Sequence, residues 1–169
     1  MNAVALHSSP WVRARNRLAC VLMFVSITLP TAAFAQTLNM INGDVTQNIV
    51  LSDLRTISDT TFTLYDPYKG RDVIMQGITF RSFLIDQFGD VPPALHFIAW
   101  DDYEVTLEGW DDPNWYLITT EDGDPLTIRT RGPVRLVERD YNKRGNRDVE
   151  NLRDFNDWIW MIRSIEAKW

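Results

Sequence analysis

The chain has 169 residues, with 17 lysines and arginines against 23 aspartates and glutamates, and therefore a net charge of −6 at pH 7. This acidic balance argues against nucleic acids and anionic membrane surfaces as partners, because both attract basic proteins. Cys20 is the only cysteine, so the chain cannot form an internal disulfide.

The first 35 residues have the pattern of a secretory signal peptide. Three arginines precede an apolar run from Leu18 to Leu29, and Ala-Phe-Ala at residues 33–35 forms a cleavage motif. The apolar run is shorter than the roughly 18–20 residues that a spanning helix needs, which disfavours the alternative of an uncleaved membrane anchor. We expect cleavage before Gln36 and an exported domain of residues 36–169. This domain would lose three arginines and no acidic residue, so its net charge becomes −9.

Short runs of β-branched and aromatic residues between turn signals indicate strands along most of this domain. The expected strands cover residues 48–51, where the fold starts, and then 60–65, 71–76, 95–100, 103–107, 115–120, 134–138 and 160–167. The run at 95–100 is almost continuously apolar and predicts a central strand, which forms a hairpin with 103–107 across Asp101-Asp102. The run at 160–167 alternates and predicts an antiparallel edge strand.

Helical signals are fewer. The clearest helix spans Thr79 to Gly89, where apolar residues at 80, 83, 84 and 88 form one face, a threonine caps the start and a glycine ends it. Ser52 is a candidate N-cap for a short helical turn. Residues 152–158 are expected to form a second short helix. The charged run from Asp140 to Asp148 is expected as a surface loop. One clear helix among about eight strands predicts a mainly β, α+β single domain.

The residue inventory argues against familiar hydrolytic and metal chemistry. His96 is the only histidine after residue 35, and it lies in an apolar strand, where a histidine is more often a hydrogen-bonded core residue than a base. Without a cysteine or a second histidine, the expected domain lacks the parts of a nucleophilic triad. It also lacks a thiolate or imidazole cluster for a transition metal.

Aromatic residues are the stronger signal, with six tryptophans after residue 35. Trp100 leads directly into Asp101-Asp102-Tyr103. A pterin needs a stacking face, and a carboxylate can accept hydrogen bonds from its ring N–H and 2-amino group as a pair. Composition alone favours the alternative, in which the tryptophans are core and the aspartates form a hairpin turn.

Several short motifs carry a family resemblance. They are Trp-Asp-Asp-Tyr at 100–103, Gly-Asp-Pro-Leu at 123–126, Arg-Gly-Pro at 131–133 and a closing Trp-x-x-x-x-Ile-Glu at 160–166. In order and spacing, across about residues 48–168, the chain resembles the molybdopterin-binding domain of the sulfite-oxidase type. In that family a cysteine thiolate holds the metal, and the domain expected here has no cysteine.

Members of this family without the cysteine resemble pterin-binding sensory proteins. The resemblance implies a non-catalytic periplasmic protein that binds a reduced pterin without molybdenum. It also implies a partner, the periplasmic sensor domain of an inner-membrane receptor that controls cyclic di-GMP synthesis or breakdown. Two alternatives stay open: a molybdopterin-dependent oxidoreductase subunit, and an interaction module with no ligand.

The resemblance, together with the aromatic and acidic residues, gives a set of expected ligand-binding positions. Asp101 or Asp102 would accept hydrogen bonds from the pterin edge. Arg131 would face a ligand carbonyl or an anionic tail, unless it is a surface arginine that balances nearby acids. The residues expected to stack on the ligand or to form its walls are Trp100, Tyr103 and Trp160.

Overall fold

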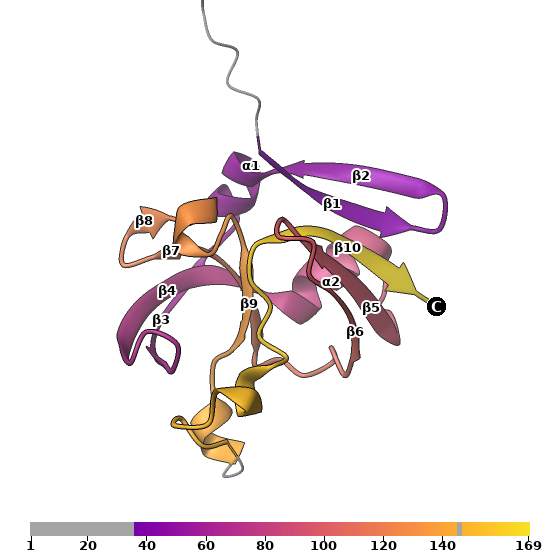
Figure 1. The fold of residues 1–169 in the computed structure, drawn as a ribbon. Helices are drawn as coiled ribbons and strands as arrows, with labels where there is room; N and C mark the ends of the chain where they lie inside the picture. The colour runs from indigo at the N-terminus through magenta and orange to yellow at the C-terminus, as the bar shows by residue number, and fades with distance from the viewer. Residues whose placement is uncertain (1–35, 145–146) are drawn as a thin grey trace, which may run out of the picture. The chain divides into compact units, whose positions relative to one another are not determined.

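A computed structural model describes residues 36–144 and 147–169, so the predicted signal peptide lies outside the described residues. The described part contains two five-stranded sheets and one longer helix, α2 (Phe80–Phe88) (Figure 1). The strands are β1 (Thr37–Asn42), β2 (Val45–Val50), β3 (Thr60–Asp66), β4 (Arg71–Thr79), β5 (Ala94–Ala99), β6 (Glu104–Glu108), β7 (Trp115–Glu121), β8 (Asp124–Pro125), β9 (Arg135–Glu138) and β10 (Ile162–Lys168). Short helical segments are α1 (Leu51–Thr56), η1 (Ile128–Thr130), η2 (Tyr141–Arg144) and η3 (Leu152–Phe155). The expected mainly β, α+β fold class is confirmed.

The first sheet has the order β2-β1-β10-β5-β6. Strand β10 pairs with β1 in parallel and with β5 in antiparallel orientation, so the prediction of an edge strand at 160–167 is wrong. The alternation along β10 reflects instead a sheet with one half-exposed face, on which Arg163 and Glu166 lie. Strand β5 is internal, as predicted, and forms the expected hairpin with β6.

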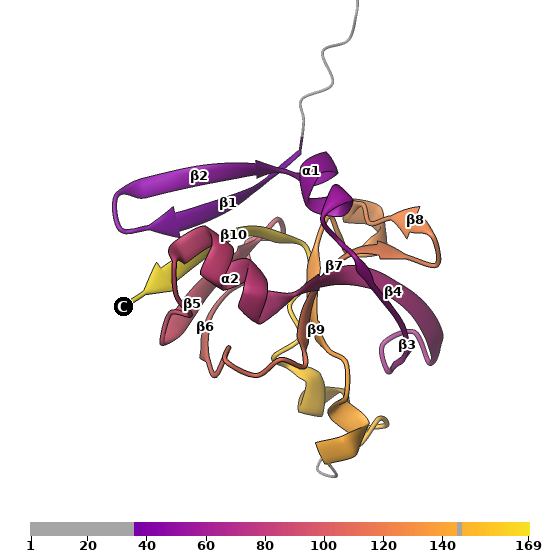
Figure 2. The same cartoon turned by 180° about the vertical axis from the view of Figure 1, so that it is seen from behind.

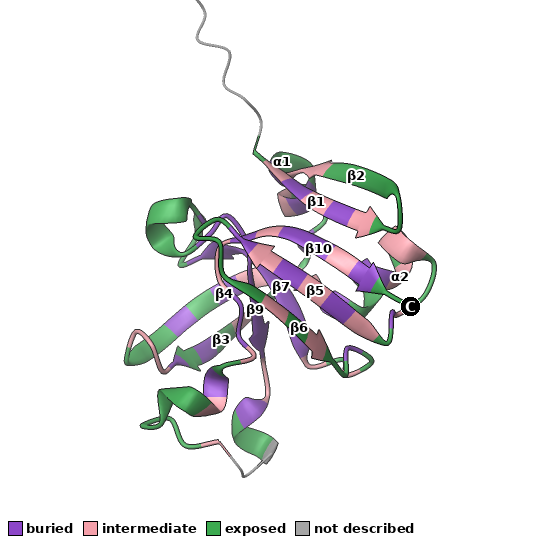
Figure 3. Ribbon diagram, turned by 45° about the vertical axis from the view of Figure 1, so that its right-hand side comes forward, coloured by how far each residue is buried: buried purple, intermediate pink, exposed green. Residues whose placement is uncertain are grey.

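The second sheet has the order β3-β4-β7-β8, and β9 also pairs with β7. Every residue of β7 is buried, which makes it the central strand of this sheet (Figure 3). Glu121, at the end of β7, is one of these buried residues. Arg135, at the start of β9, is also buried. The polar interior at this end of the sheet underlies the candidate site described below.

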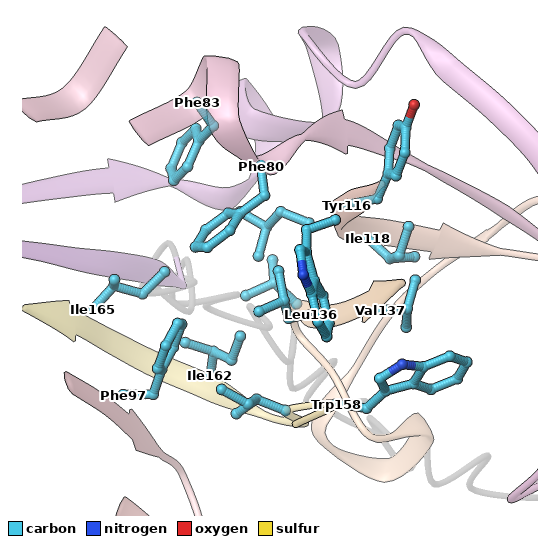
Figure 4. Close-up of a cluster of buried hydrophobic side chains, with 14 of the residues drawn as sticks. Phe80, Phe83, Phe97, Tyr116, Ile118, Leu136, Val137, Trp158, Ile162 and Ile165 are labelled. Atoms are coloured by element: carbon cyan, nitrogen blue, oxygen red, sulfur yellow. The ribbon is translucent and has the colours of Figure 1, made fainter. Parts of the chain in front are cut away.

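Aromatic side chains fill the core (Figure 4). Phe80 of α2 contacts Phe97 of β5, and α2 lies beside β5 in both ribbon views (Figures 1 and 2). Trp110 packs edge-on against both rings at centroid distances of 5.3 Å, and its indole N–H donates to the Leu107 carbonyl. Trp110 is therefore a core residue, in agreement with the interpretation that composition alone favoured for the tryptophans.

The beginning of the fold differs from the prediction. A hairpin of β1 and β2 precedes α1, so the fold starts at Thr37 and not at Asn48. The strand β1 alternates buried and half-exposed residues, but its two asparagines weaken the signal because asparagine is depleted in strands. Ser52 lies inside α1, and Val50 occupies the cap position without a side-chain hydrogen bond. By contrast, Gly89 ends α2 in the left-handed conformation, as predicted.

Two further predictions are corrected in part. His96 is half-buried on the open face of β5, where it contacts Thr106 at 3.1 Å and Glu104 at 3.4 Å, so it is hydrogen-bonded but not in the core. The charged segment expected as a surface loop begins with a buried residue, because Tyr141 packs among core aromatics, and residues 145–146 of that segment lie outside the described residues. No helix among the described residues is long and apolar enough to cross a membrane.

Gly77 allows the close approach of β4 and β7. A Cβ atom at this position would lie 2.2 Å from the Leu117 carbonyl oxygen, and a register shift in β4 occurs between Gln76 and Gly77. We expect Gly77→Ala to lower the free energy of unfolding by about 1–3 kcal/mol, the usual cost of overpacking, as measured by urea denaturation. Thr63→Ala, at an exposed position of β3, serves as the control and should change stability by less than about 0.5 kcal/mol. Equal stabilities of the two variants would contradict this account.

Candidate functional site

Two adjoining hollows of about 300 and 310 Å³ share the lining residues Tyr68, Asp101 and Trp160. Tyr103, Asn156 and Trp158 complete the first hollow, and Arg131 and Met161 complete the second. We call the two hollows together the aromatic groove. Its residues come from the β3–β4 turn, the β5–β6 turn, the residue after η1, and the segment between η3 and β10. The volumes of the two hollows are at the lower end of the range typical of small-molecule sites.

Trp160 is the central residue of the aromatic groove. The Tyr68 ring meets its ring edge-on, with centroids 4.8 Å apart and planes at 85°. The guanidinium carbons of Arg135 and Arg131 lie 3.7 and 4.9 Å from the Trp160 centroid. Cation–π contacts of this kind are attractive and strengthen when the cation is shielded from water. The indole is thereby held by two guanidinium groups and one aromatic ring.

The buried cation beneath Trp160 belongs to an ion cluster. Arg135 is fully buried, and its Nη1 donates to Asp66 Oδ2 at 2.9 Å and to Glu121. Lys69 pairs with the same glutamate. The other Asp66 oxygen accepts the backbone N–H of Tyr68 at 2.9 Å. This cluster thus orients both the turn that carries Tyr68 and the ring of Trp160.

Tyr68 connects this cluster to the segment around η3. Its hydroxyl lies 3.1 Å from the Phe155 carbonyl oxygen and donates to it. Burial raises the pKa of Tyr68, and the negative charges of Asp157 and Asp66 act in the same direction, while Arg131 and Arg135 oppose the shift. The phenol therefore stays protonated and acts as a hydrogen-bond donor at neutral pH.

Arg147 ties the residues around η3 to the end of β9. Its guanidinium binds both Asp157 carboxylate oxygens, at 2.8 and 2.6 Å, and lies 2.7 Å from buried Glu138. It also donates to the Asp154 carbonyl. A two-pronged arginine–carboxylate contact is geometrically specific. It fixes the position of the chain immediately before Trp158, which is one of the groove residues.

Four of the sequence-predicted site residues line the aromatic groove: Asp101, Tyr103, Arg131 and Trp160. Asp101 Oδ1 accepts the backbone N–H of Tyr103 at 3.3 Å, which shapes the β5–β6 turn. Its carboxylate is exposed and keeps lone pairs available for a ligand. Of the two aspartates that the sequence left open, Asp101 is the one in the groove.

The structure places Trp100 and Asp102 outside the lining of both hollows. Asp102 adopts a positive φ of 63° and lies 3.6 Å from Arg163, and the same guanidinium lies 5.8 Å from the Trp100 centroid. These three residues form a separate surface group. The backbone turn between Asp101 and Tyr103 directs neighbouring side chains to different places, which a sequence motif alone does not reveal.

Four groove residues were not predicted: Tyr68, Asn156, Trp158 and Met161. Tyr68 lies between the strands expected at 60–65 and 71–76, and the available signal was Asp66 two residues earlier, because aspartate is a typical turn-capping residue. The sequence predicts a short helix over residues 152–158 that would include Trp158, whereas η3 ends at Phe155. The Trp-x-Trp spacing at 158–160, in an irregular segment, was the available signal that both indoles line the same hollow.

The side chains available as metal ligands or hydrogen-bond partners determine which metal or cofactor the groove suits. The sole cysteine, Cys20, lies outside the described residues, and within 36–144 and 147–169 no three His, Cys, Asp or Glu residues gather as metal ligands. These residues therefore do not suit a molybdenum held by cysteine. The aromatic walls and the Asp101 carboxylate suit the ring of a pterin, since they offer stacking surface and hydrogen-bond acceptors.

Comparison with known proteins bears on the fold. No family model and no curated protein matches the sequence. Among solved structures, the chain is similar to the sulfane dehydrogenase SoxCD from Paracoccus pantotrophus, with 15% identity and a TM-score of 0.51, over 78% of this chain and 38% of that one. At this identity the likeness shows the fold alone. It agrees with the molybdopterin-related fold that the sequence resemblance predicts.

Glu138 provides a test of the contacts that hold the β9–β10 segment. Burial raises its pKa above the ordinary 4.5, although Arg147 opposes the shift. Because the folded state has the higher pKa, the contribution of Glu138 to stability is present below the unfolded pKa and is lost as pH rises through the folded one. We therefore expect Glu138→Gln to gain stability relative to wild type as pH rises above about 4, measured by urea denaturation across pH. The exposed Glu150→Gln should show no such trend, and a relative loss with rising pH in Glu138→Gln would contradict the account.

Proposed function

We propose that the protein is a non-catalytic periplasmic binding protein for a reduced pterin, which signals to a membrane-bound cyclic di-GMP enzyme. The observation that carries the ligand proposal is the position of Asp101 in a groove walled by Tyr68, Tyr103 and Trp160. A flat ring between these aromatic side chains would bring its N–H edge to a carboxylate. Charge-assisted hydrogen bonds of this kind are among the stronger ones in proteins.

The absence of catalysis is proposed from the residues that line the groove. None of its described lining residues is a cysteine, a histidine, a serine or a lysine. The groove lining therefore lacks the serine, cysteine and lysine nucleophiles and the histidine base of the most familiar covalent mechanisms. Tyr68, with its raised pKa, is a poor base at neutral pH because its phenol remains protonated.

The periplasmic location and the signalling partner rest on the signal-peptide pattern and the family resemblance. The net charge of −9 after cleavage complements a basic patch on a receptor sensor domain, and complementary charge increases association rates. The proposed partner is the periplasmic sensor domain of an inner-membrane receptor. Loops often carry such contacts, and the segment from Asp140 to Asp148 is the most polar one in the chain.

A molybdopterin-dependent oxidoreductase subunit is the second candidate, and the likeness to part of a sulfane dehydrogenase favours it. It would need a metal held by the cofactor itself or by a carboxylate. Metal analysis of protein expressed with molybdate distinguishes the two functions, since only the second requires stoichiometric molybdenum. A third candidate, an interaction module with a collapsed pocket, is disfavoured by the two hollows that remain beside Trp160.

The binding proposal predicts different behaviour of two adjacent aspartates. Asp101→Asn should weaken binding of a tetrahydropterin by about 10- to 100-fold, because hydrogen bonds to a charged group contribute about 1.5–3 kcal/mol. Asp102→Asn is the matched control and should leave affinity unchanged, since Asp102 lies outside the groove. Quenching of tryptophan fluorescence measures both affinities. Equal affinities of both variants and wild type would refute Asp101 as the acceptor, and a wild type that binds no tetrahydropterin would refute the function.

The signalling proposal predicts reciprocal coupling. If the pterin changes affinity for the receptor's sensor domain, that domain must change pterin affinity by the same factor. We expect a factor of about 5–150, the usual range for linked sites. Titration of the pterin with and without the soluble sensor domain measures it. Identical affinities, with complex formation confirmed, would leave a pterin-storage protein without a sensory role.

A further inference from the structure

Strand β2 is an open edge of the first sheet. It pairs with β1 on one side, and Figures 1 and 2 show no other described element along its other side. The side chains of residues 45–48 are exposed. Val45, at 68% exposure, is the most exposed of the large hydrophobic side chains among the residues that the structure describes.

The sequence of β2 lacks the features that usually protect such an edge. Natural edge strands are protected by charged side chains, by proline or by being very short. Strand β2 has six residues and contains neither a charged residue nor a proline. By contrast, β6 at the other edge of the same sheet begins with Glu104 and ends with Glu108. The unprotected edge of β2 is therefore suited to pairing with a further strand.

The hydrogen bonds of the β1–β2 hairpin determine which backbone groups of β2 are free. The Leu51 N–H donates to the Gln36 carbonyl oxygen at 3.0 Å. These two residues lie one position beyond the pair of Thr37 and Val50, so they form a hydrogen-bonded pair of the ladder. Because hydrogen-bonded and non-hydrogen-bonded pairs alternate, residues 45, 47 and 49 direct their N–H and C=O groups toward β1. Those of residues 46, 48 and 50 point outward to the free edge.

The sequence of β2 is complementary to itself in one antiparallel register. A two-fold axis perpendicular to the sheet pairs each residue with one from the same face of the strand. When Gln47 faces its own copy, Val45 meets Ile49 of the second copy. Thr46 then meets Asn48 of that copy, so apolar side chains pair with apolar ones and polar with polar, without any charge at the contact. The next symmetric register, in which Asn48 faces its own copy, would place Gln47 opposite Ile49.

We propose that the protein forms a two-fold symmetric dimer in which the β2 strands of two copies pair in antiparallel orientation around Gln47. The outward N–H and C=O groups of Thr46 and Asn48 form the hydrogen bonds between the copies, and the first sheets of both copies join into one continuous sheet. The contact is small, so the dimer is expected to be weak. The inference goes beyond the proposed function and does not depend on it, because none of the described residues that line the aromatic groove belongs to β1 or β2.

Sedimentation velocity tests the dimer on protein expressed from its full coding sequence. We expect the average mass to rise from one chain toward two as the concentration increases from about 1 to about 500 µM. Asn48→Pro removes one outward N–H from each copy and no donor to β1, so it should weaken the dimer by about tenfold or more. Asn48→Ala keeps this N–H and is the matched control, which should weaken the dimer by less than about threefold.

Cysteine cross-linking tests the register without altering the backbone. Residues that face each other in a non-hydrogen-bonded pair have Cα atoms about 4.5 Å apart, a separation that a disulfide can span. In a Cys20→Ser background, Gln47→Cys should therefore form mostly covalent dimer under mild oxidation. Thr63→Cys, at an exposed position of β3, the edge strand of the second sheet, is the matched control and should stay monomeric.

Each outcome decides for or against the β2 dimer. Cross-linking through residue 47 alone, together with a weaker dimer in Asn48→Pro, supports it. A mass of one chain across the whole concentration range would overturn it, and so would a mass that keeps rising beyond two chains. A dimer that Asn48→Pro leaves unchanged, or equal cross-linking through residues 47 and 63, would place the contact elsewhere and overturn it as well. None of these results bears on pterin binding, which the tetrahydropterin titration tests separately.

Discussion

The buried guanidinium of Arg135 is the constraint on which the groove depends. A fully buried cation is costly unless it is paired and hydrogen-bonded, and Arg135 obtains its partners from the ends of two other strands, β3 and β7. Its remaining face lies against Trp160 at 3.7 Å. The pairing therefore ties three strand ends of one sheet to an indole that precedes the last strand of the other sheet. Removing one partner would leave a buried charge uncompensated, a larger penalty than the loss of one contact.

The residues that line the groove come from distant parts of the chain. Tyr68, Asp101, Arg131 and Trp160 come from four separate connections between strands, and each is fixed by a different local device. Asp66 caps the first turn, and the capping box around η1 sets the third connection. The chain before Trp160 is held by Arg147 through Asp157 and Glu138. Connections of this kind tolerate changes of sequence better than strands, so the same sheets can carry different sites.

The sequence predicted most elements because their signals are local. Alternation identified β3 and β6, an apolar run after a turn signal identified β4, and the helical face with its terminal glycine identified α2. The place of β10 between β1 and β5 was not predictable in this way. Parallel pairing such as Asn39 with Ser164 joins distant parts of the chain, and alternation shows only which face is exposed. In the site, Asp101, Arg131 and Trp160 followed from motif order, whereas Tyr68 and Trp158 depended on the packing of an irregular segment.

Our central proposal is that the protein binds a pterin without the metal, and it rests on the resemblance of the sequence, on the lack of a cysteine in the described residues and on the aromatic groove that contains Asp101. The most direct test is mass spectrometry of small molecules released from the full-length protein, purified anaerobically without denaturant, together with metal analysis of the same sample. We predict a reduced pterin at close to one per chain and no stoichiometric molybdenum. Stoichiometric molybdenum, or a ligand-free protein whose tryptophan fluorescence does not respond to tetrahydropterins, would contradict the account.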